Sequence, residues 1–139
     1  MLFQAAVIYS RTSMFPGQRL IPLATQQDTN GDTERRVACI LTTAIGTVEA
    51  GHLDRRHLVF AVFMAGFGTL LSDAKIQSID LIKAMEDSGI GQNTQRTRRL
   101  LSAVCDEQGR RIEAGGRAEE VDWLLLAQQH QLTVINCGL

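Results

Sequence analysis

The hydrophobic and polar positions of the chain are organised around one uncharged stretch, Leu58 to Leu71, with the sequence LVFAVFMAGFGTLL. Positions three and four apart share a helical face, and here every such face carries large apolar side chains. A bilayer-crossing helix needs about 18 or more apolar residues, so this shorter stretch favours a core helix. We predict a central helix buried on several sides. Ala61, Ala65 and Gly68 form a line of small residues along it, where a neighbouring helix is expected to approach closely.

Helical periodicity continues on both sides of this stretch and predicts five further helices. They are expected at residues 2 to about 13, about 33 to 50, about 72 to 88, about 94 to 114 and 121 to about 130. The polar residues 22–32 are predicted to form a loop, with Asp32 or Thr33 as N-cap of the second helix. A chain of 139 residues accommodates one compact domain. We therefore predict an all-α fold, a single domain over residues 1–139 with about six helices in one bundle or helical array.

The same periodicity predicts which side chains face the core and which face water. The expected inward positions of the flanking helices are Val37, Ile40, Leu41, Ala44, Ile45, Val48, Ile76, Ile79, Ile82, Met85, Leu100, Leu101, Val104 and Ile112. The expected outward positions of the fourth helix are Asp73, Gln77, Asp80, Lys83 and Asp87. On the fifth helix, Asp106 with Arg110 and Glu107 with Arg111 are predicted ion pairs, each worth about 0.2–0.5 kcal/mol. Gly51, Gly89 and Gly115 are the expected helix-ending glycines.

Composition and charge narrow the functional classes. The chain is 45% hydrophobic and 21% charged, with a formal net charge of -1. Neither nucleic acid nor an acidic membrane surface is strongly attracted by such a balance, so we expect no direct nucleic-acid contact and no membrane association. Cys39, Cys105 and Cys137 are widely spaced and form no CxxC pair, which argues against a disulfide framework or a cysteine zinc site. An intracellular location is expected, with no cofactor and no metal.

Candidate acid/base chemistry is confined to a short segment before the central helix. His52, Asp54 and His57 lie close in sequence there, as an acid/base pair or a histidine and carboxylate metal site would require. The alternative is a solvated loop in which Asp54 caps the helix that follows. If the protein is an enzyme, these three residues are the first catalytic candidates, with Tyr9 as a hydrogen-bond donor; the expectation we favour is a protein without catalytic residues.

Two groups of basic residues are candidates for anion binding. The first comprises Tyr9, Arg11, Gln18 and Arg19 around the Pro16-Gly17 turn, and the second comprises Arg96, Arg98 and Arg99. A turn with an adjacent arginine can bind an anion through charge-assisted hydrogen bonds. In both groups the simpler interpretation is favoured: a Pro-Gly turn pinned by Arg19, and a solvated arginine face.

The glycine-rich and aromatic positions have simple packing interpretations. GFG and GIGQNT follow no predicted strand and lack the lysine of a phosphate loop, so we interpret them as helix packing and a turn. Trp123 and Phe63 are candidates for lining a ligand cavity, although aromatic residues at helical spacing usually belong to the core.

Three long segments of the chain suggest a family. AAVIYSRTSMFPGQRL stands near the start, LVFAVFMAGFGTLLSDAKIQSIDLIKAMEDSGIGQNTQRTRRLL in the middle, and EEVDWLLLAQQHQLTVINCGL at the end. Within them the motifs MFPGQRL, FMAGF, GIGQNT, VDWL and a terminal NCGL follow in that order. Together they resemble the C-terminal part of the fungal-specific transcription factor domain, the helical region found downstream of the zinc-cluster DNA-binding module in many fungal regulators.

The resemblance implies a regulatory domain, and its departures modify that expectation. The zinc-cluster module uses six closely spaced cysteines, and this chain has three scattered ones, so the resemblance implies a regulator without its own DNA-binding module, in the nucleus or cytoplasm. The upstream helices of the larger domain also have no counterpart, so we expect a homo-oligomer or a protein partner through the helix from Leu2 to Tyr9, with a small hydrophobic ligand as a further partner class. The alternative from another class is a small enzyme or ligand-binding protein of fungal secondary metabolism, recruited from this helical domain.

Overall fold

The structure, a computed structural model, describes residues 1–12, 23–51, 56–89 and 91–132 and is helical throughout these ranges apart from short turns. Its elements are α1 (Leu2–Thr12), α2 (Leu23–Glu49), α3 (Arg56–Gly68), α4 (Ser72–Asp87), α5 (Gly91–Glu113), the short 3-10 helix η1 (Ala118–Glu120) and α6 (Trp123–Gln129). The described ranges therefore confirm the predicted all-α array.

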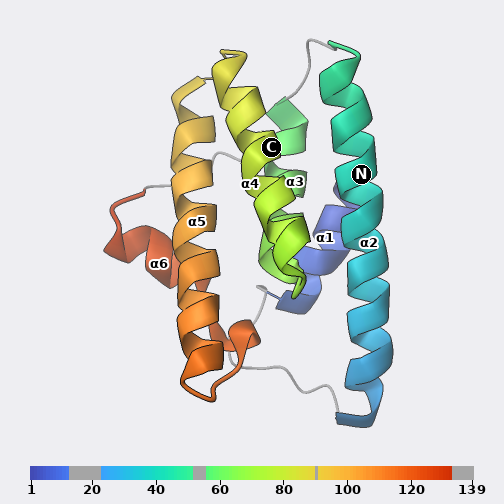
Figure 1. Ribbon diagram of the computed structural model, residues 1–139, viewed down its shortest axis with the longest axis vertical. Helices are drawn as coiled ribbons and strands as arrows, with labels where there is room; N and C mark the ends of the chain where they lie inside the picture. The colour runs from blue at the N-terminus through green and yellow to red at the C-terminus, as the bar shows by residue number, and fades with distance from the viewer. Residues whose placement is uncertain (13–22, 52–55, 90, 133–139) are drawn as a thin grey trace.

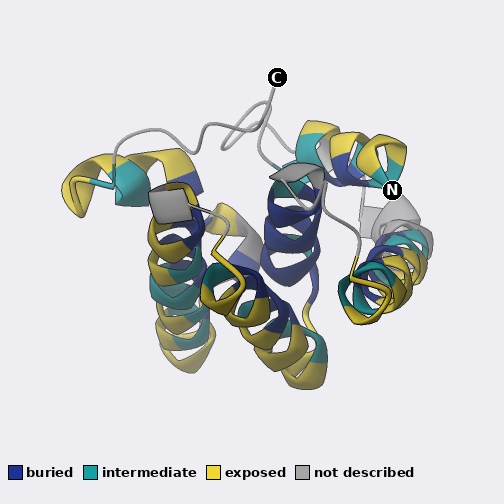
Figure 2. Ribbon diagram, turned by 90° about the horizontal axis from the view of Figure 1, so that it is seen from above, coloured by how far each residue is buried: buried dark blue, intermediate teal, exposed yellow. Residues whose placement is uncertain are grey.

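Helix α3 is the centre of the arrangement. It packs against α1, α2, α4 and α5. The four long segments α2 to α5 run alternately up and down the long axis, so that α2 and α4 point the same way, whereas α1 and α6 lie across them (Figure 1). Figure 2 shows α3 dark blue over most of its length, with the buried residues of the other helices facing it. The predicted central core helix is confirmed.

The composition of α3 explains why four helices surround it. Val62, Phe63, Met64 and Ala65 are all fully buried, although four consecutive residues point in four directions around a helix. No single neighbouring helix can cover all four directions. Burial of each large apolar side chain contributes roughly 1.5–3 kcal/mol, so the lowest free energy requires a neighbour on each side.

Glycines set the spacing between α3 and its neighbours. A Cβ added at Gly68 would lie 2.7 Å from Ile8 Cγ2 of α1, as the predicted small-residue line implies. A Cβ added at Gly66 would lie 2.8 Å from Ser78 Cβ of α4 and 2.9 Å from Leu101 Cδ2 of α5. The close approach thus occurs on two sides of α3, and the contact at Gly66 is one that the sequence analysis did not predict.

The start of α2 differs from the prediction. The helix begins at Leu23, directly after Pro22 in the sequence, so the predicted loop over residues 22–32 is wrong over most of its length. Neither Asp32 nor Thr33 is an N-cap, because both lie inside the helix. Residues 23–30 contain neither glycine nor proline, and their Gln, Thr, Asp and Asn side chains are tolerated in helices at small cost. Asp32 instead accepts a hydrogen bond from Arg36 Nε at 2.9 Å, one turn later.

The end of α3 is also earlier than predicted. The apolar run continues to Leu71, but the helix ends at Gly68. Buried Thr69 leaves the helix and donates its hydroxyl to Glu34 Oε2 at 2.7 Å, while the Leu70 amide donates to Glu34 Oε1 at 2.8 Å. The Leu71 amide donates to Thr69 Oγ1 at 3.1 Å. The Leu70 and Leu71 amides thus bond to side-chain oxygens in place of backbone carbonyls of the helix. The chain turns into α4, and Leu70 and Leu71 are left exposed.

Most predicted core positions are confirmed, and two are wrong. Ile76 is 59% exposed and Ile112 is 55% exposed. The series Ile76, Ile79, Ile82 and Met85 advances by three residues each time, and each step of three falls short of a full turn by about 60°, so its ends lie on opposite sides of the helix. Ile112 lies in the last turns of α5, which continue past the start of α4 (Figure 1).

Smaller differences concern the helix ends. Helix α5 begins at Gly91, about three residues before the predicted start. Helix α6 begins at Trp123, where Asp122 is the N-cap and accepts from the Leu124 and Leu125 amides, so the predicted start is two residues too early. The glycines Gly51, Gly89 and Gly115 all have positive φ, as predicted. The sequence also predicts a short extended tail from Leu132 to Cys137, of which residues 133–137 lie outside the described residues. None of the described helices combines the length and hydropathy needed to cross a bilayer.

The close contact at Gly66 gives a test of this packing. We expect Gly66→Ala to lower the free energy of unfolding by about 1 kcal/mol, because an overpacking cost of about 1–3 kcal/mol exceeds the gain of about 0.8–1 kcal/mol in helix propensity. Gly46→Ala is the control, since a Cβ there meets nothing within 4 Å. Urea denaturation should show Gly46→Ala to be more stable than the parent chain. Equal stabilisation by both substitutions would contradict the close approach.

Candidate functional site

The structure places one of the proposed catalytic residues and not the other three. Tyr9 is half-buried on α1 and packs against Phe60 of α3, with ring centroids 6.3 Å apart. His52 and Asp54 lie outside the described residues. His57 belongs to α3, but its side chain also lies outside the described part of the chain. The proposed acid/base cluster therefore stays a prediction, and the described contact of Tyr9 is an aromatic one in the core.

In the arginine group at the start of α5, one residue forms an ion pair with α4. Arg98 Nε donates to Glu86 Oε2 of α4 at 2.7 Å, and this hydrogen bond raises the pKa of Arg98. Arg96 and Arg99 are exposed. This geometry agrees with the solvated face favoured from the sequence. The other group cannot be compared, because Gln18, Arg19 and the side chain of Arg11 lie outside the described residues.

The aromatic and glycine-rich positions have the packing roles that were favoured. Phe63 and Trp123 meet edge to face at a centroid distance of 5.2 Å, and both are buried. Gly66 and Gly68 of the GFG motif face neighbouring helices at close distance. Among the described residues, no group of three or more His, Cys, Asp or Glu side chains is arranged to hold a metal ion.

A surface groove lies between α2 and α4. Its volume is about 930 Å³, and it is open to solvent. On α2 it is lined by Glu34, Val37, Ala38, Leu41, Thr42 and Ile45, and on the α4 side by Leu71, Ser72, Asp73, Ala74, Ile76, Gln77, Asp80 and Leu81. The buried side chains of Val37, Leu41 and Leu81 form its floor. We refer to this feature as the α2–α4 groove.

The walls of the α2–α4 groove expose large apolar side chains to water. Leu71 is 58% exposed and Ile76 is 59% exposed, and both line the groove. Exposed apolar side chains that line a concave surface are typical of interaction sites. The polar lining residues Thr42, Asp73 and Asp80 are exposed, so the groove has an apolar floor and polar edges.

One end of the groove is fixed by the Glu34 carboxylate. This side chain lines the groove from α2 and accepts the hydrogen bonds from Thr69 and Leu70 in the turn between α3 and α4. A carboxylate that accepts two hydrogen bonds ties the two walls together at the point where the α4 wall begins. Hydrogen bonds to a charged group contribute about 1.5–3 kcal/mol each.

The α4 wall is held from its other side by Gln108 of α5. This buried side chain donates from Nε2 to the Phe67 carbonyl at 3.1 Å, near the end of α3. Its Oε1 accepts a hydrogen bond from Lys75 of α4. A single amide thus satisfies a carbonyl at the end of one helix and fixes the position of another helix.

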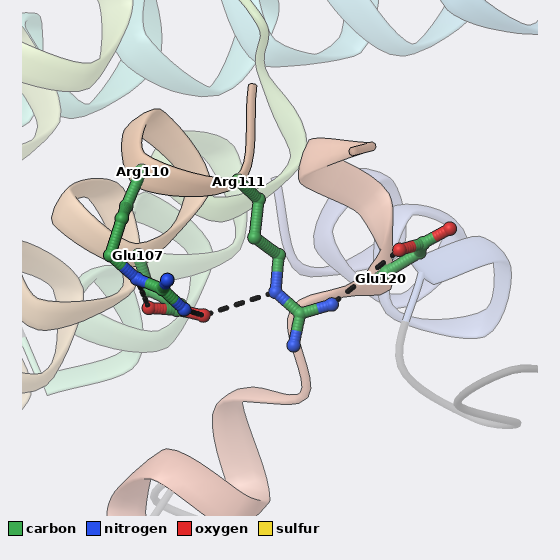
Figure 3. A network of polar contacts seen from close by, with 4 residues as sticks. All are labelled: Glu107, Arg110, Arg111 and Glu120. Carbon is green, nitrogen blue, oxygen red and sulfur yellow. Dashed lines mark hydrogen bonds and ion pairs between the residues drawn. The ribbon is translucent and has the colours of Figure 1, made fainter. Parts of the chain in front are cut away.

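A separate ion-pair network joins the end of α5 to η1 (Figure 3), and none of its residues lines the groove. Glu107 accepts from Arg110 at 2.7 Å and from Arg111 at 3.0 Å, and Arg111 lies 3.5 Å from Glu120. The predicted pair of Glu107 with Arg111 is confirmed. No Asp106–Arg110 contact accompanies it in the described residues, because Arg110 bonds to Glu107. The two guanidinium groups lower the pKa of Glu107 from 4.5 to about 2.

The sequence analysis did not identify the groove, because it assigned Ile76 to the core. A usable signal was present. Ile76 is an apolar residue on the same helix as the outward positions Asp73 and Asp80, and a helical projection places Ile76 nearer to Asp80 than to Met85. An apolar side chain within an otherwise polar face indicates a contact surface.

Comparisons with protein-family models, curated proteins and solved structures find no match to this chain.

The lowered pKa of Glu107 predicts a specific acid response. The stabilisation that depends on its carboxylate is complete above the ordinary pKa of 4.5 and is lost as the pH falls through about 2. We expect the Glu107 carboxyl signal in an NMR titration to have its midpoint near 2. In Glu107→Gln this part of the pH dependence of stability should vanish. A midpoint near 4.5 in the parent chain would mean that the arginines do not hold the carboxylate in solution.

Proposed function

We propose that this chain is a non-catalytic protein-interaction domain that binds a helical segment of a partner in the α2–α4 groove. The observation that carries the proposal is the open, apolar-floored groove whose walls expose Leu71 and Ile76. Helices commonly bind in such grooves through apolar residues at positions i, i+3, i+4 and i+7.

The dimensions of the groove favour a helix as its occupant. The lining runs from Glu34 to Ile45 on α2 and from Leu71 to Leu81 on α4. At a rise of about 1.5 Å per residue these walls are about 15 Å long, which corresponds to about three turns of a bound helix. A pocket for a small molecule normally encloses most of its ligand, whereas this groove is open to solvent.

The family resemblance supports a regulatory setting for this interaction. The chain is similar in motif order to the C-terminal part of the fungal-specific transcription factor domain, and its three cysteines cannot supply the six of the zinc-cluster module. In this proposal the protein regulates transcription in the nucleus or cytoplasm through protein contacts and without direct DNA contact.

A second surface supports self-association through α1, as the sequence analysis expected. Leu2 and Phe3 are exposed, and Phe3 is 70% exposed. The opposite side of the same helix is buried, with Ala5 and Ile8 at 0% exposure. Helix α1 therefore presents apolar side chains on two sides, and the outer side is suited to a second copy of the chain.

Ligand binding is the second candidate function. The groove volume of about 930 Å³ falls within the range of pockets that hold small molecules. A small hydrophobic ligand of fungal secondary metabolism is the occupant that this alternative requires. The acid/base candidates His52, Asp54 and His57 would supply any chemistry, and their side chains lie outside the described residues.

The groove proposal can be tested with an uncharged amphipathic peptide of about 14 residues that carries a leucine stripe and glutamine flanks. We expect it to shift the amide NMR signals of residues 37–45 and 71–81. Thr42→Trp should abolish these shifts by filling the groove, because Thr42 lines it. Thr43→Trp is the matched control, since Thr43 is the next residue, is exposed and does not line the groove. Identical binding by both variants would refute the assignment of the groove.

The α1 surface is tested by the oligomeric state. We expect Phe3→Glu to shift the chain towards monomer in sedimentation-velocity experiments, because a charge cannot be buried at a dimer interface without a partner. Ser10→Glu is the control on an exposed position of the same helix. A parent chain that is monomeric at all accessible concentrations would contradict self-association, and so would a dimer that Phe3→Glu leaves unchanged.

A further inference from the structure

The charged residues that line the α2–α4 groove all have the same sign. They are Glu34, Asp73 and Asp80, and no Lys, Arg or His side chain among the described residues lines the groove. Arg35 and Lys83 belong to the same helices but lie outside the lining. Glu34 is occupied by its hydrogen bonds to Thr69 and Leu70. Asp73 and Asp80 remain available for a partner.

Asp73 and Asp80 are exposed carboxylates without a counter-ion in the described part of the chain. Both have more than a third of their surface in water, and neither forms an ion pair or side-chain hydrogen bond with another described residue. Asp73 lies in the first turn of α4, where a negative charge is favourable to the helix dipole. That explanation does not extend to Asp80, which lies in the middle of the helix.

The spacing of the two carboxylates matches a helical partner. Seven residues advance a helix by about 10.5 Å and return it to within about 20° of the same direction. Asp73 and Asp80 therefore form a row along one wall of the groove, next to the exposed side chain of Ile76. A helix lying along the groove would present its own residues to this row at the same spacing of seven.

We propose that the occupant of the α2–α4 groove is an amphipathic helix of another protein that carries two Lys or Arg residues seven positions apart beside its apolar stripe. The apolar stripe covers Leu71, Ile76 and the groove floor, and the two basic side chains pair with Asp73 and Asp80. This inference rests on the proposed function and adds the chemistry of the partner to it.

The helices in the described part of the chain do not have this pattern, and for this reason we assign the occupant to a different protein. Helix α1 contains a single basic residue, Arg11, and α6 contains none. The exposed large apolar residue of α5 is Ile112, and the basic residues beside it, Arg110 and Arg111, are bonded to Glu107. A second copy of the chain therefore offers no described helix face that pairs exposed apolar residues with two basic residues seven positions apart.

The test compares three fluorescent peptides with the same leucine stripe and with Lys, Gln or Glu at two flank positions seven apart. Fluorescence anisotropy with the full chain should show the Lys peptide binding about tenfold more tightly than the Glu peptide, as two exposed charge pairs allow. Raising the salt concentration from about 50 mM to about 500 mM should largely remove this preference. The double variant Asp73→Asn with Asp80→Asn should weaken binding of the Lys peptide about fivefold and leave the Gln peptide unaffected.

A matched control removes the same charge elsewhere. Asp106→Asn with Glu113→Gln neutralises two exposed carboxylates of α5, neither of which lines the groove, and should leave all three affinities unchanged. If the three peptides bind the parent chain equally well and Thr42→Trp blocks all of them, the charge inference is overturned and the groove function stands. If no peptide binds, both proposals fail. The control variant could also lose the preference for the Lys peptide over the Glu peptide as fully as the groove variant does. That result would show a long-range charge effect and would overturn the inference.

Discussion

The fold depends on the requirement that α3 be covered on all sides. A helix with apolar side chains around its whole circumference cannot be satisfied by one partner, so α1, α2, α4 and α5 must each contribute a face. Gly66 and Gly68 let three of these neighbours approach within van der Waals contact. The flanking helices are therefore positioned chiefly by their contacts with α3, and the grooves between them follow from where those contacts place their axes.

Much of the fold could be predicted from the sequence because the strongest signal, the uncharged central stretch, is also the element that organises the packing. The errors occur where a contact distant in sequence overrides a local pattern. The apolar run predicts a helix through Leu71, but Glu34, thirty-five residues before Thr69, supplies acceptors that end it at Gly68. The polar composition of residues 22–32 suggests a loop, although residues 23–30 contain neither glycine nor proline and are compatible with a helix that is anchored further along.

The candidate site was less predictable than the fold. The candidate acid/base residues His52, Asp54 and His57 were predicted from residue type and proximity in sequence. The groove depends instead on which side of α4 Ile76 occupies, and a count in steps of three gave the wrong side because the angular error accumulates over the three steps from Ile76 to Met85. The pairing of α2 with α4 is a tertiary contact between helices separated by α3, and no local pattern encodes it. A surface defined by two such helices becomes visible only in three dimensions.

The Glu34 carboxylate has a consequence beyond ending a helix. It fixes the corner between α2 and the start of α4, and the two helices run in the same direction from that corner (Figure 1). Glu34 therefore holds the two groove walls together at that end, while contacts with α3 position the rest of each helix. Substitution of Glu34 would remove the acceptors at that corner and leave the exposed side chains of Leu71 and Ile76 on the groove walls unchanged in identity. In the proposed interaction, the shape of this end of the groove and the chemistry of its exposed walls thus depend on different residues.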